Sequence, residues 1–216
     1  MTEILYLTDW FIPKIAQHSA VKSSKRLSAN RLGVLRRDGV ALTIAPVQVE
    51  ILSADLVEQI LQDDIPTIIC LVPKASHYLW SARERATELG SDVQTMSEVF
   101  WSMTEEDPQG FLSNDVTVTR RILRQHSQAH QVEMICESSM RIARAGGMSD
   151  VTVSVEYGYE FGEEALVKAL DRHPGMDVVL NSNPNGRMTA AALEHAKHAG
   201  VRLLNLSSLM GALKNP

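Results

Sequence analysis

The sequence predicts an α/β fold with mostly parallel sheets flanked by helices, arranged as two pseudo-repeated halves. The first observation is internal similarity, because residues 56–103 and 166–213 share a pattern of apolar and small residues 110 positions apart. The identical pairs include Leu56/Leu166, Ala82/Ala192, Gly90/Gly200 and Ser97/Ser207. The second observation is that short apolar segments alternate with helical segments. This alternation is typical of parallel strands joined by right-handed crossovers.

In the first half, each expected element has a local signal. Ser53 can cap a helix, the apolar run that begins at Thr67 suits a strand covered on both faces, and Gly90 can end a helix. The expected elements are a strand at Thr43–Ile51, a helix at Ala54–Gln62, a strand at Thr67–Val72, a helix at Ser76–Leu89, a strand at Asp92–Thr95 and a helical turn at Ser97–Met103.

The second half repeats this order. Its expected elements are a strand at Val151–Tyr157, a helix at Glu163–Leu170, a strand at Asp177–Leu180, a helix at Thr189–Ala199, a strand at Val201–Leu206 and a helical turn at Ser208–Leu213. Before each copy we expect a helical stretch, roughly Ala16–Leu35 in the first half and Thr117–Ala145 in the second.

Composition and length favour an ordinary globular protein in two parts. We expect a first half at 1–103, a polar linker at 104–115 and a second half at 116–216. The apolar content of 44% is average, and no apolar run approaches the length of a membrane span. The N-terminus has no signal-peptide features, and two cysteines do not make a disulfide framework. We therefore expect a cytoplasmic protein without a membrane partner.

Charge is distributed unevenly along the chain. Seven basic residues and no acidic one lie between Trp10 and Arg37, although the whole chain carries a net charge of −5. A basic stretch on an acidic body is the electrostatic footprint of a polyanion site. The candidate nucleic-acid-binding residues are Lys22, Lys25, Arg26, Arg31, Arg36 and Arg37. The alternative is a solvated face, or a surface that pairs with acidic patches of the same protein.

Two polar loops follow the expected buried strands. Because ligands collect at the carboxyl ends of parallel strands, both loops are candidate ligand sites. Their candidate residues are Lys74 and His77 in the first half, and Asn181, Asn183, Asn185 and Arg187 in the second. Lys74 and His77 could bind a phosphate, and the second loop offers amides and a cation. The alternative is that Asn-Pro-Asn-Gly is an ordinary tight turn.

Residues 177–213 resemble the C-terminal part of Mrr-type restriction-endonuclease-like domains. The shared features are a buried strand that ends at Asn181-Ser182, a helix capped by Thr189 with alanines at Ala192 and Ala196, and a Leu-rich closing turn. The resemblance covers about a sixth of the chain and contains no catalytic atoms. It implies a nuclease-like ancestry.

In that family, the resemblance implies an acidic residue and a strand that carries Gln or Glu before Lys, together holding magnesium. The candidate strands are Val47–Glu50 and Val153–Glu156, with Asp38 and Asp150 upstream. Both strands have glutamate at the position of the lysine, so the standard nuclease pattern is incomplete. The acidic sets Asp38/Glu50 and Asp150/Glu156 could still hold Mg²⁺.

Three functions remain open at this point. The leading hypothesis is a nucleic-acid- or nucleotide-binding protein of nuclease-like ancestry whose catalysis is degenerate or absent. The second is an enzyme or sensor for a small phosphorylated or nucleotide ligand at the strand-end loops. The third is a protein–protein interaction module with its acidic body as the active surface. No catalytic residue is assigned by any of the three.

Overall fold

The computed structural model describes residues 4–72 and 76–214. The chain divides into two compact units, with the boundary between Phe111 and Leu112. Residues up to Phe111 are called unit 1, and residues from Leu112 are called unit 2. Each unit contains helices and a mixed sheet, which confirms the α/β class.

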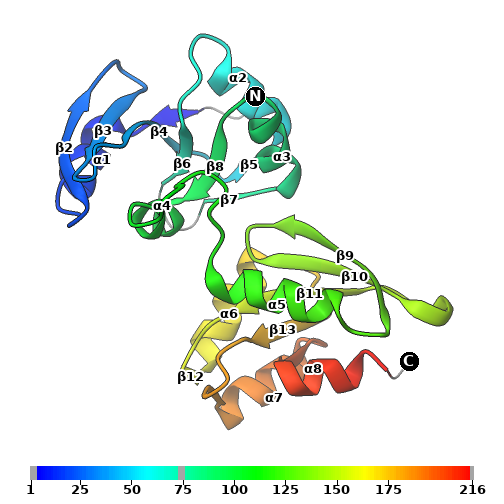
Figure 1. Cartoon of the computed structure of the whole chain (residues 1–216). Helices are drawn as coiled ribbons and strands as arrows, with labels where there is room; N and C mark the ends of the chain where they lie inside the picture. The colour runs from blue at the N-terminus through cyan, green and yellow to red at the C-terminus, as the bar shows by residue number, and fades with distance from the viewer. Residues whose placement is uncertain (1–3, 73–75, 215–216) are drawn as a thin grey trace. The chain divides into compact units, whose positions relative to one another are not determined.

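Unit 1 is built on a sheet with the strand order β2-β3-β4-β6-β8, and β1 pairs with the far end of β4 (Figure 1). These strands are β1 (Leu5–Tyr6), β2 (Val21–Arg26), β3 (Leu32–Arg36), β4 (Ala41–Gln48), β6 (Ile68–Leu71) and β8 (Asp92–Thr95). A small separate sheet joins β5 (Ile51–Leu52) to β7 (His77–Tyr78). The helices are α1 (Thr8–Ile15), α2 (Ala54–Leu61), α3 (Trp80–Glu88) and α4 (Met96–Ser102).

Alternate residues of β4 point to two different cores. Leu42 and Ile44 pack in a cluster with Phe11 of α1 and Val99 of α4. Ala45 and Val47 belong to a cluster formed with α2 and α3. Since successive side chains of a strand point to opposite faces, this central strand is covered by helices on both sides along its second half.

Unit 2 has a sheet with the order β15-β13-β11-β10-β9. The strands are β9 (Ala129–Cys136), β10 (Ser139–Arg144), β11 (Val151–Glu156), β13 (Val178–Asn181) and β15 (Arg202–Asn205). Two short strands, β12 (Glu160–Phe161) and β14 (Arg187–Met188), pair beside it. The helices are α5 (Asn114–Arg124), α6 (Glu163–Arg172), α7 (Ala190–His198) and α8 (Leu206–Ala212), with a 3-10 turn at Ala145–Gly147.

The alternation of strands and helices that begins at β4 and at β11 is confirmed within a few residues per element. The expected sheet type is not confirmed. Within the two main sheets, parallel pairing is limited to β4-β6-β8 and β11-β13-β15, and the remaining strands are antiparallel. The small β5–β7 and β12–β14 sheets are parallel. The two main sheets are therefore mixed rather than mostly parallel.

The two expected helical stretches are wrong. Ala16–Leu35 begins just after α1 ends at Ile15 and contains β2 and most of β3. Thr117–Ala145 contains the rest of α5 and then the β9–β10 hairpin. In β9, Val132, Met134 and Cys136 are buried at every second position, which is the period of a strand. This alternation outweighs the helical propensity of the surrounding polar residues.

A buried ion pair fastens the end of unit 1. Arg83 of α3 and Asp92 of β8 are both almost fully buried, with the Arg83 Nε 2.9 Å from an Asp92 oxygen. Arg83 also donates to the Tyr78 hydroxyl at 3.0 Å and to the Phe111 carbonyl at 2.7 Å. Asp92 accepts from the Gly110 amide at 2.9 Å. One charge pair therefore holds the segment that follows α4 against the sheet.

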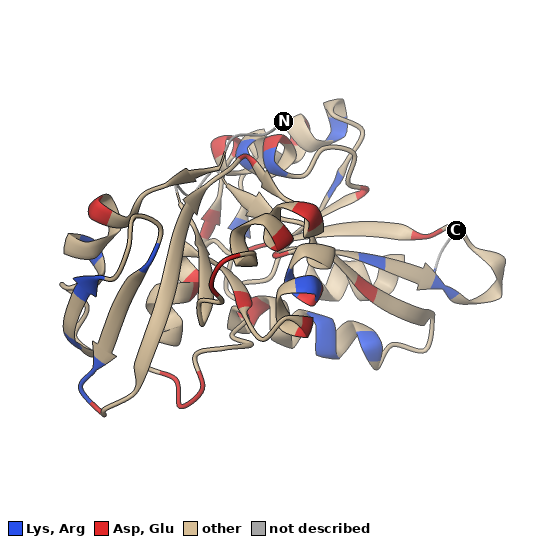
Figure 2. Ribbon diagram, turned by 90° about the horizontal axis from the view of Figure 1, so that it is seen from above, with Lys and Arg blue, Asp and Glu red and all other residues tan. Residues whose placement is uncertain are grey.

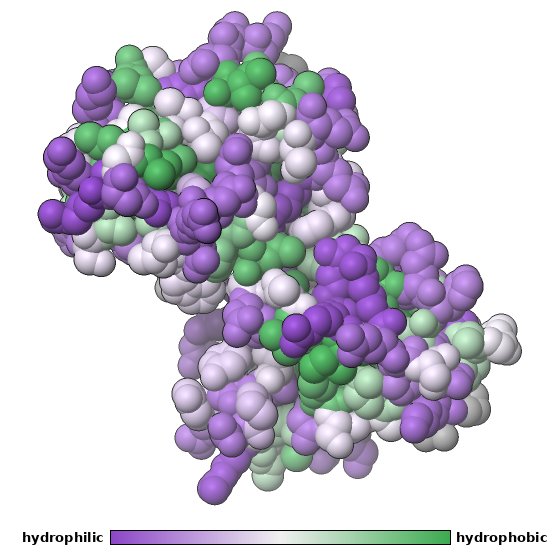
Figure 3. Space-filling view, viewed as in Figure 1, coloured by the Kyte–Doolittle hydropathy of each residue, from purple (hydrophilic) through white to green (hydrophobic). Residues whose placement is uncertain are grey.

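Among the described residues, no helix combines the length and apolar character that crossing a membrane requires. The visible face of each unit carries small hydrophobic patches separated by hydrophilic side chains (Figure 3). Exposed large apolar side chains, such as those of Ile65 and Leu193, come from separate elements. Single exposed apolar residues of this kind are normal on a protein surface.

We predict that Arg83→Leu destabilises unit 1 by about 3–5 kcal/mol, because it leaves the Asp92 charge buried without its partner. All three tryptophans, Trp10, Trp80 and Trp101, lie in unit 1, so tryptophan fluorescence during urea unfolding follows this unit selectively. The matched control is Arg85→Leu on the same helix, where the ion pairs to glutamates are solvent-exposed. An equal loss of stability in both variants would contradict the assignment.

Candidate functional sites

The asparagine-rich loop after β13 is built around a clamp to the loop after β11. The buried Asn181 side chain accepts from the Gly158 amide at 3.2 Å and donates to the Gly158 carbonyl at 3.0 Å. A Cβ atom at Gly186 would lie 2.5 Å from both the Asn181 amide nitrogen and the Gly158 carbonyl oxygen. Only glycine therefore permits this close approach. The Asn181 side chain therefore holds the loop after β13 against the loop after β11.

Asn183 differs from Asn181, because its amide nitrogen is buried and has no hydrogen-bond partner among the residues that the structure describes. Its oxygen accepts from the Asn185 amide at 3.0 Å, which fixes the orientation of the side chain. A buried donor without a partner is unusual and indicates a water or ligand contact. Asn185 and Arg187 are exposed on the same loop.

The loop after β11, which contains Gly158, also carries two exposed tyrosines. Tyr157 and Tyr159 flank Gly158, and their side chains are 56% and 70% exposed. The ring centroids are 6.1 Å apart with an angle of 85° between the planes, an edge-to-face arrangement. The Arg187 amide donates to the Tyr159 carbonyl at 2.7 Å. The tyrosines and the asparagine loop thus form one continuous structure, which we call the tyrosine loop (residues 157–159 and 181–187).

Glu156 lies directly before the tyrosine loop, at the end of β11. Burial raises the pKa of its carboxyl group above the ordinary value, although Arg172 at 3.7 Å and the Ser154 hydroxyl at 3.3 Å favour the charged form. The proximity of Asp115 in the first turn of α5 raises the pKa slightly further. Glu156 is therefore a carboxyl group that retains its proton to higher pH than an exposed glutamate.

The structure also brings together a cluster that the sequence did not reveal. Cys136, Glu137 and His173 are all buried, and each offers a ligand atom within 4.8 Å of the others. Cys136 and Glu137 lie at the β9–β10 turn, whereas His173 follows α6. Cys136 and His173 are 37 positions apart, so they form no sequence motif. The β9–β10 turn was also missed, because we expected a helix over Thr117–Ala145.

The six basic residues proposed for nucleic-acid binding lie on and around the β2–β3 hairpin rather than on a helix (Figure 2). Several of them have structural partners within unit 1. Arg31 and Arg36 are buried, where Arg31 donates to the Ile60 carbonyl at 2.7 Å and Arg36 to the Glu105 carbonyl. Arg26 pairs with Asp9, and the exposed Arg37 donates to the Ser19 carbonyl. Lys22 and Lys25 are the exposed lysines of β2.

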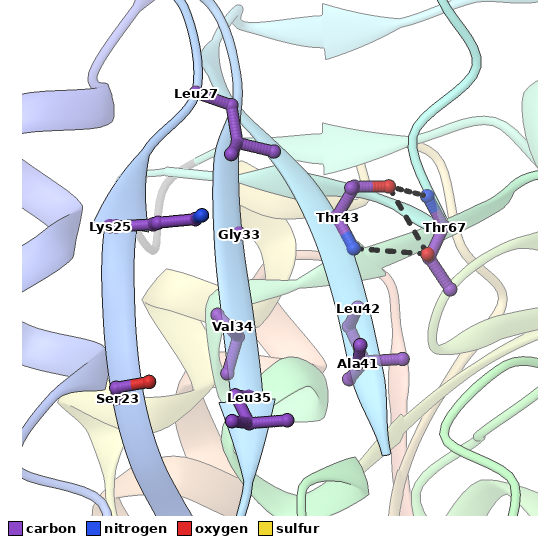
Figure 4. A pocket seen from close by; sticks show the side chains of 10 residues that line it. All are labelled: Ser23, Lys25, Leu27, Gly33, Val34, Leu35, Ala41, Leu42, Thr43 and Thr67. Carbon is purple, nitrogen blue, oxygen red and sulfur yellow. Dashed lines mark hydrogen bonds between the residues drawn. The ribbon is translucent and has the colours of Figure 1, made fainter. Parts of the chain in front are cut away.

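A groove of about 440 Å³ lies along the β2–β3 hairpin and the first residues of β4. The side chain of Lys25 extends over Gly33, and Leu27 overhangs one end (Figure 4). The Thr43 and Thr67 hydroxyls border the groove 3.2 Å from each other, and each also accepts from the other residue's backbone amide. The groove therefore combines a mainly apolar lining with one ammonium group.

The acidic pairs proposed for magnesium are not brought together. Asp150 precedes β11 and Glu156 ends it, which separates them by about 20 Å at the rise of a strand. Asp38 lies in the β3–β4 turn and pairs with Arg36, whereas Glu50 follows the other end of β4. β4 alone places roughly 25 Å between them. Neither pair can hold one shared ion.

The remaining predicted site lies in unit 1. His77 is the first residue of β7 and is half-buried. Lys74 lies outside the residues that the structure describes.

We predict that Glu156→Gln stabilises unit 2 near neutral pH and that the gain disappears below the ordinary glutamate pKa of 4.5. Because the folded-state pKa is raised, the proton on Glu156 favours folding at low pH, and this contribution is lost as the pH rises through the folded-state pKa. Urea unfolding followed by circular dichroism, with the tryptophan signal used to identify unit 1, measures the difference. Glu160→Gln, which changes the exposed glutamate of β12, is the control. A gain that is the same at all pH values would contradict the buried-carboxyl account.

In comparisons with known proteins, no family model matches the chain, and no curated protein or solved structure is significantly similar to it.

Proposed function

We propose that this chain binds single-stranded nucleic acid through the tyrosine loop of unit 2. The observation that carries the proposal is the exposed pair Tyr157 and Tyr159 at the carboxyl end of β11. Ligands of α/β sheets collect at the carboxyl ends of parallel strands. Exposed aromatic rings stack on nucleic-acid bases, and each stacked base contributes about 1–3 kcal/mol.

The polar groups of the same loop suit the rest of a nucleotide. Arg187 supplies a cation for a phosphate, and the exposed side-chain amide of Asn185 can donate to a base or sugar oxygen. Their loop is fixed by the Asn181 clamp, so a ligand would meet groups that are already ordered. Stacking together with a cation is the combination that single-strand binding uses.

Four glutamates lie near the tyrosine loop, and their negative charges would repel a phosphate group. Glu163 lies 2.9 Å from a ring nitrogen of His195, and Glu164 lies 2.6 Å from Lys168. Glu156 is partly buried and lies 3.7 Å from the guanidinium of Arg172, whose positive charge opposes its own. Glu160 is the exposed acid on the short strand that pairs with Arg187. Two of these four acids, Glu156 and Glu164, therefore have a cationic side chain beside them that opposes the repulsion of a phosphate.

We propose in addition that the two units are copies of one ancestral, nuclease-like domain. In support, both main sheets place an antiparallel hairpin beside three parallel strands. The registers also correspond, because Ile68 pairs with Asp92 in unit 1 and Val178 pairs with Arg202 in unit 2, each shifted by 110 positions. Glutamate replaces the family's lysine at Glu50 and Glu156, so catalysis of the standard type is absent in this proposal.

A second candidate function is the binding of a small anionic ligand in the groove of unit 1. The observation that favours it is the Lys25 ammonium over a mainly apolar lining. Small-molecule sites usually combine an apolar lining with few polar groups of this kind. A small phosphorylated compound that protects the chain against heat, with protection lost in Lys25→Ala but retained in Tyr159→Ala, would support this alternative.

We predict that Tyr157→Ala and Tyr159→Ala each weaken the binding of a fluorescently labelled single-stranded oligonucleotide by roughly 5- to 150-fold, which corresponds to the loss of one stacked base. Fluorescence anisotropy at low and physiological salt measures this affinity. The control is Trp101→Ala, which removes an exposed aromatic side chain of unit 1.

The same titration distinguishes the tyrosine loop from the basic hairpin. If the hairpin contributes phosphate contacts, the double variant Lys22→Ala/Lys25→Ala should reduce the slope of log affinity against log salt concentration by at most about two. If this double variant abolishes binding and the tyrosine variants bind normally, the hairpin is the site. If the wild-type chain binds no oligonucleotide even at low salt, the proposed function is wrong.

A further inference from the structure

We propose that Cys136, Glu137 and His173 of unit 2 form a zinc-binding site. The three residues offer a thiolate sulfur, a carboxylate oxygen and an imidazole nitrogen, and these are the ligand types that zinc takes in proteins. Neither the nucleic-acid proposal nor the nuclease resemblance uses these residues. The site is therefore independent of the proposed function.

The distances fit a tetrahedral ion. Zinc–ligand bonds of about 2.0–2.3 Å place neighbouring ligand atoms of a tetrahedron roughly 3.5 Å apart. The Cys136 sulfur lies 3.4 Å from the Nδ1 atom of His173, and all three ligand atoms lie within 4.8 Å of one another. Small side-chain movements are enough to bring the Glu137 carboxylate to the same centre.

The orientation of His173 is already that of a metal ligand. Its Nδ1 atom faces the Cys136 sulfur, and its Nε2 atom lies 2.9 Å from the Ser138 hydroxyl. Histidines that bind metals usually use the second ring nitrogen for a hydrogen bond, which fixes the ring and its tautomer. Ser138 would supply this bond.

The backbone holds the turn in place. The Val155 amide donates to the Ser138 carbonyl at 2.7 Å, so the β9–β10 turn is fixed against β11. His173 ends α6 and is 4% exposed, and Cys136 is 3% exposed. The donors therefore come from the β9–β10 turn and the end of α6 and lie away from solvent, which favours a selective metal site.

A structural tether is the alternative role for these residues. In unit 1, the corresponding β2–β3 turn is tied to the end of α2 by Arg31, which donates to the carbonyls of Ile60 and Asp64. One arginine is thus sufficient to hold such a turn against its helix. Unit 2 has a thiol, a carboxyl group and an imidazole at this place instead, and all three are ligand types of zinc.

The thiol of Cys136 is protonated in the absence of a metal. Burial and then the nearby Glu137 charge raise the pKa of this thiol to about 12. Binding of zinc would replace the thiol proton, which leaves to solvent, by a sulfur–zinc bond. Binding should therefore weaken as the pH falls.

We predict that the full-length chain, freed of metal by a chelator and then dialysed, binds one equivalent of zinc chloride and gains thermal stability. Cobalt(II) chloride should produce a thiolate-to-cobalt charge-transfer band in the near ultraviolet. Cys136→Ser should abolish the band, and Ser138→Ala should weaken cobalt affinity by about tenfold through loss of the second hydrogen bond. Cys70→Ala, which removes the only other thiol, should leave the band unchanged.

The wild-type measurement decides the proposal without any variant. If the folded wild-type chain binds no zinc and gives no cobalt band near neutral pH, the cluster is only a hydrogen-bonded tether. If the band persists in Cys136→Ser but is lost in Cys70→Ala, the metal is bound elsewhere. His195→Ala tests for adventitious binding by an exposed histidine, and it should change neither zinc stoichiometry nor the band.

Discussion

The antiparallel pairing between β10 and β11 is the constraint on which the candidate sites of unit 2 depend. It places Ser139 opposite Ser154, and the Val155 amide bonds to the Ser138 carbonyl just beyond that pair. The β9–β10 turn is therefore held at the end of the sheet where the parallel strands β11 and β13 finish. The tyrosine loop and the Cys136–Glu137 turn both lie at this end of the sheet.

Unit 1 uses the same strand order for different chemistry. Its hairpin turn is tied down by the buried Arg31, and its far end by Arg36 bonded to Asp38 and the Glu105 carbonyl. The chain segment after α4 is held by the pair Arg83 and Asp92. Arginines in unit 1 thus serve mainly to fasten backbone, whereas the corresponding turn of unit 2 carries a thiol, a carboxyl group and an imidazole. The chemical difference between the two turns therefore comes from their side chains and not from the fold.

The sequence predicted the second part of each unit well, because buried parallel strands such as Ile68–Leu71 and capped helices give strong local signals. It failed at the two hairpins. Their basic and polar residues hide the period-two burial that becomes plain in β9, and register between strands is a tertiary property. For the same reason, the basic stretch was identified correctly as basic, but the burial of Arg31 and Arg36 could not be seen.

The sites show a similar limit. The asparagine loop was located from its position after a strand, yet its division into a clamping Asn181 and an unpartnered Asn183 depends on contacts with Gly158 across the sheet. Tyr157 and Tyr159 alternate in the sequence with no sign of their exposure. Cys136 and His173 are distant in sequence and meet only through the β10–β11 pairing and α6.

The central claim is that a ligand binds at the carboxyl ends of β11 and β13. Amide chemical-shift mapping of the isotope-labelled full-length chain, titrated with a short single-stranded oligonucleotide, tests it most directly. The account predicts the largest changes at Gly158, Tyr159, the Asn183 side-chain amide and Arg187. Changes confined to the β2–β3 hairpin around Lys22 and Lys25 would contradict it.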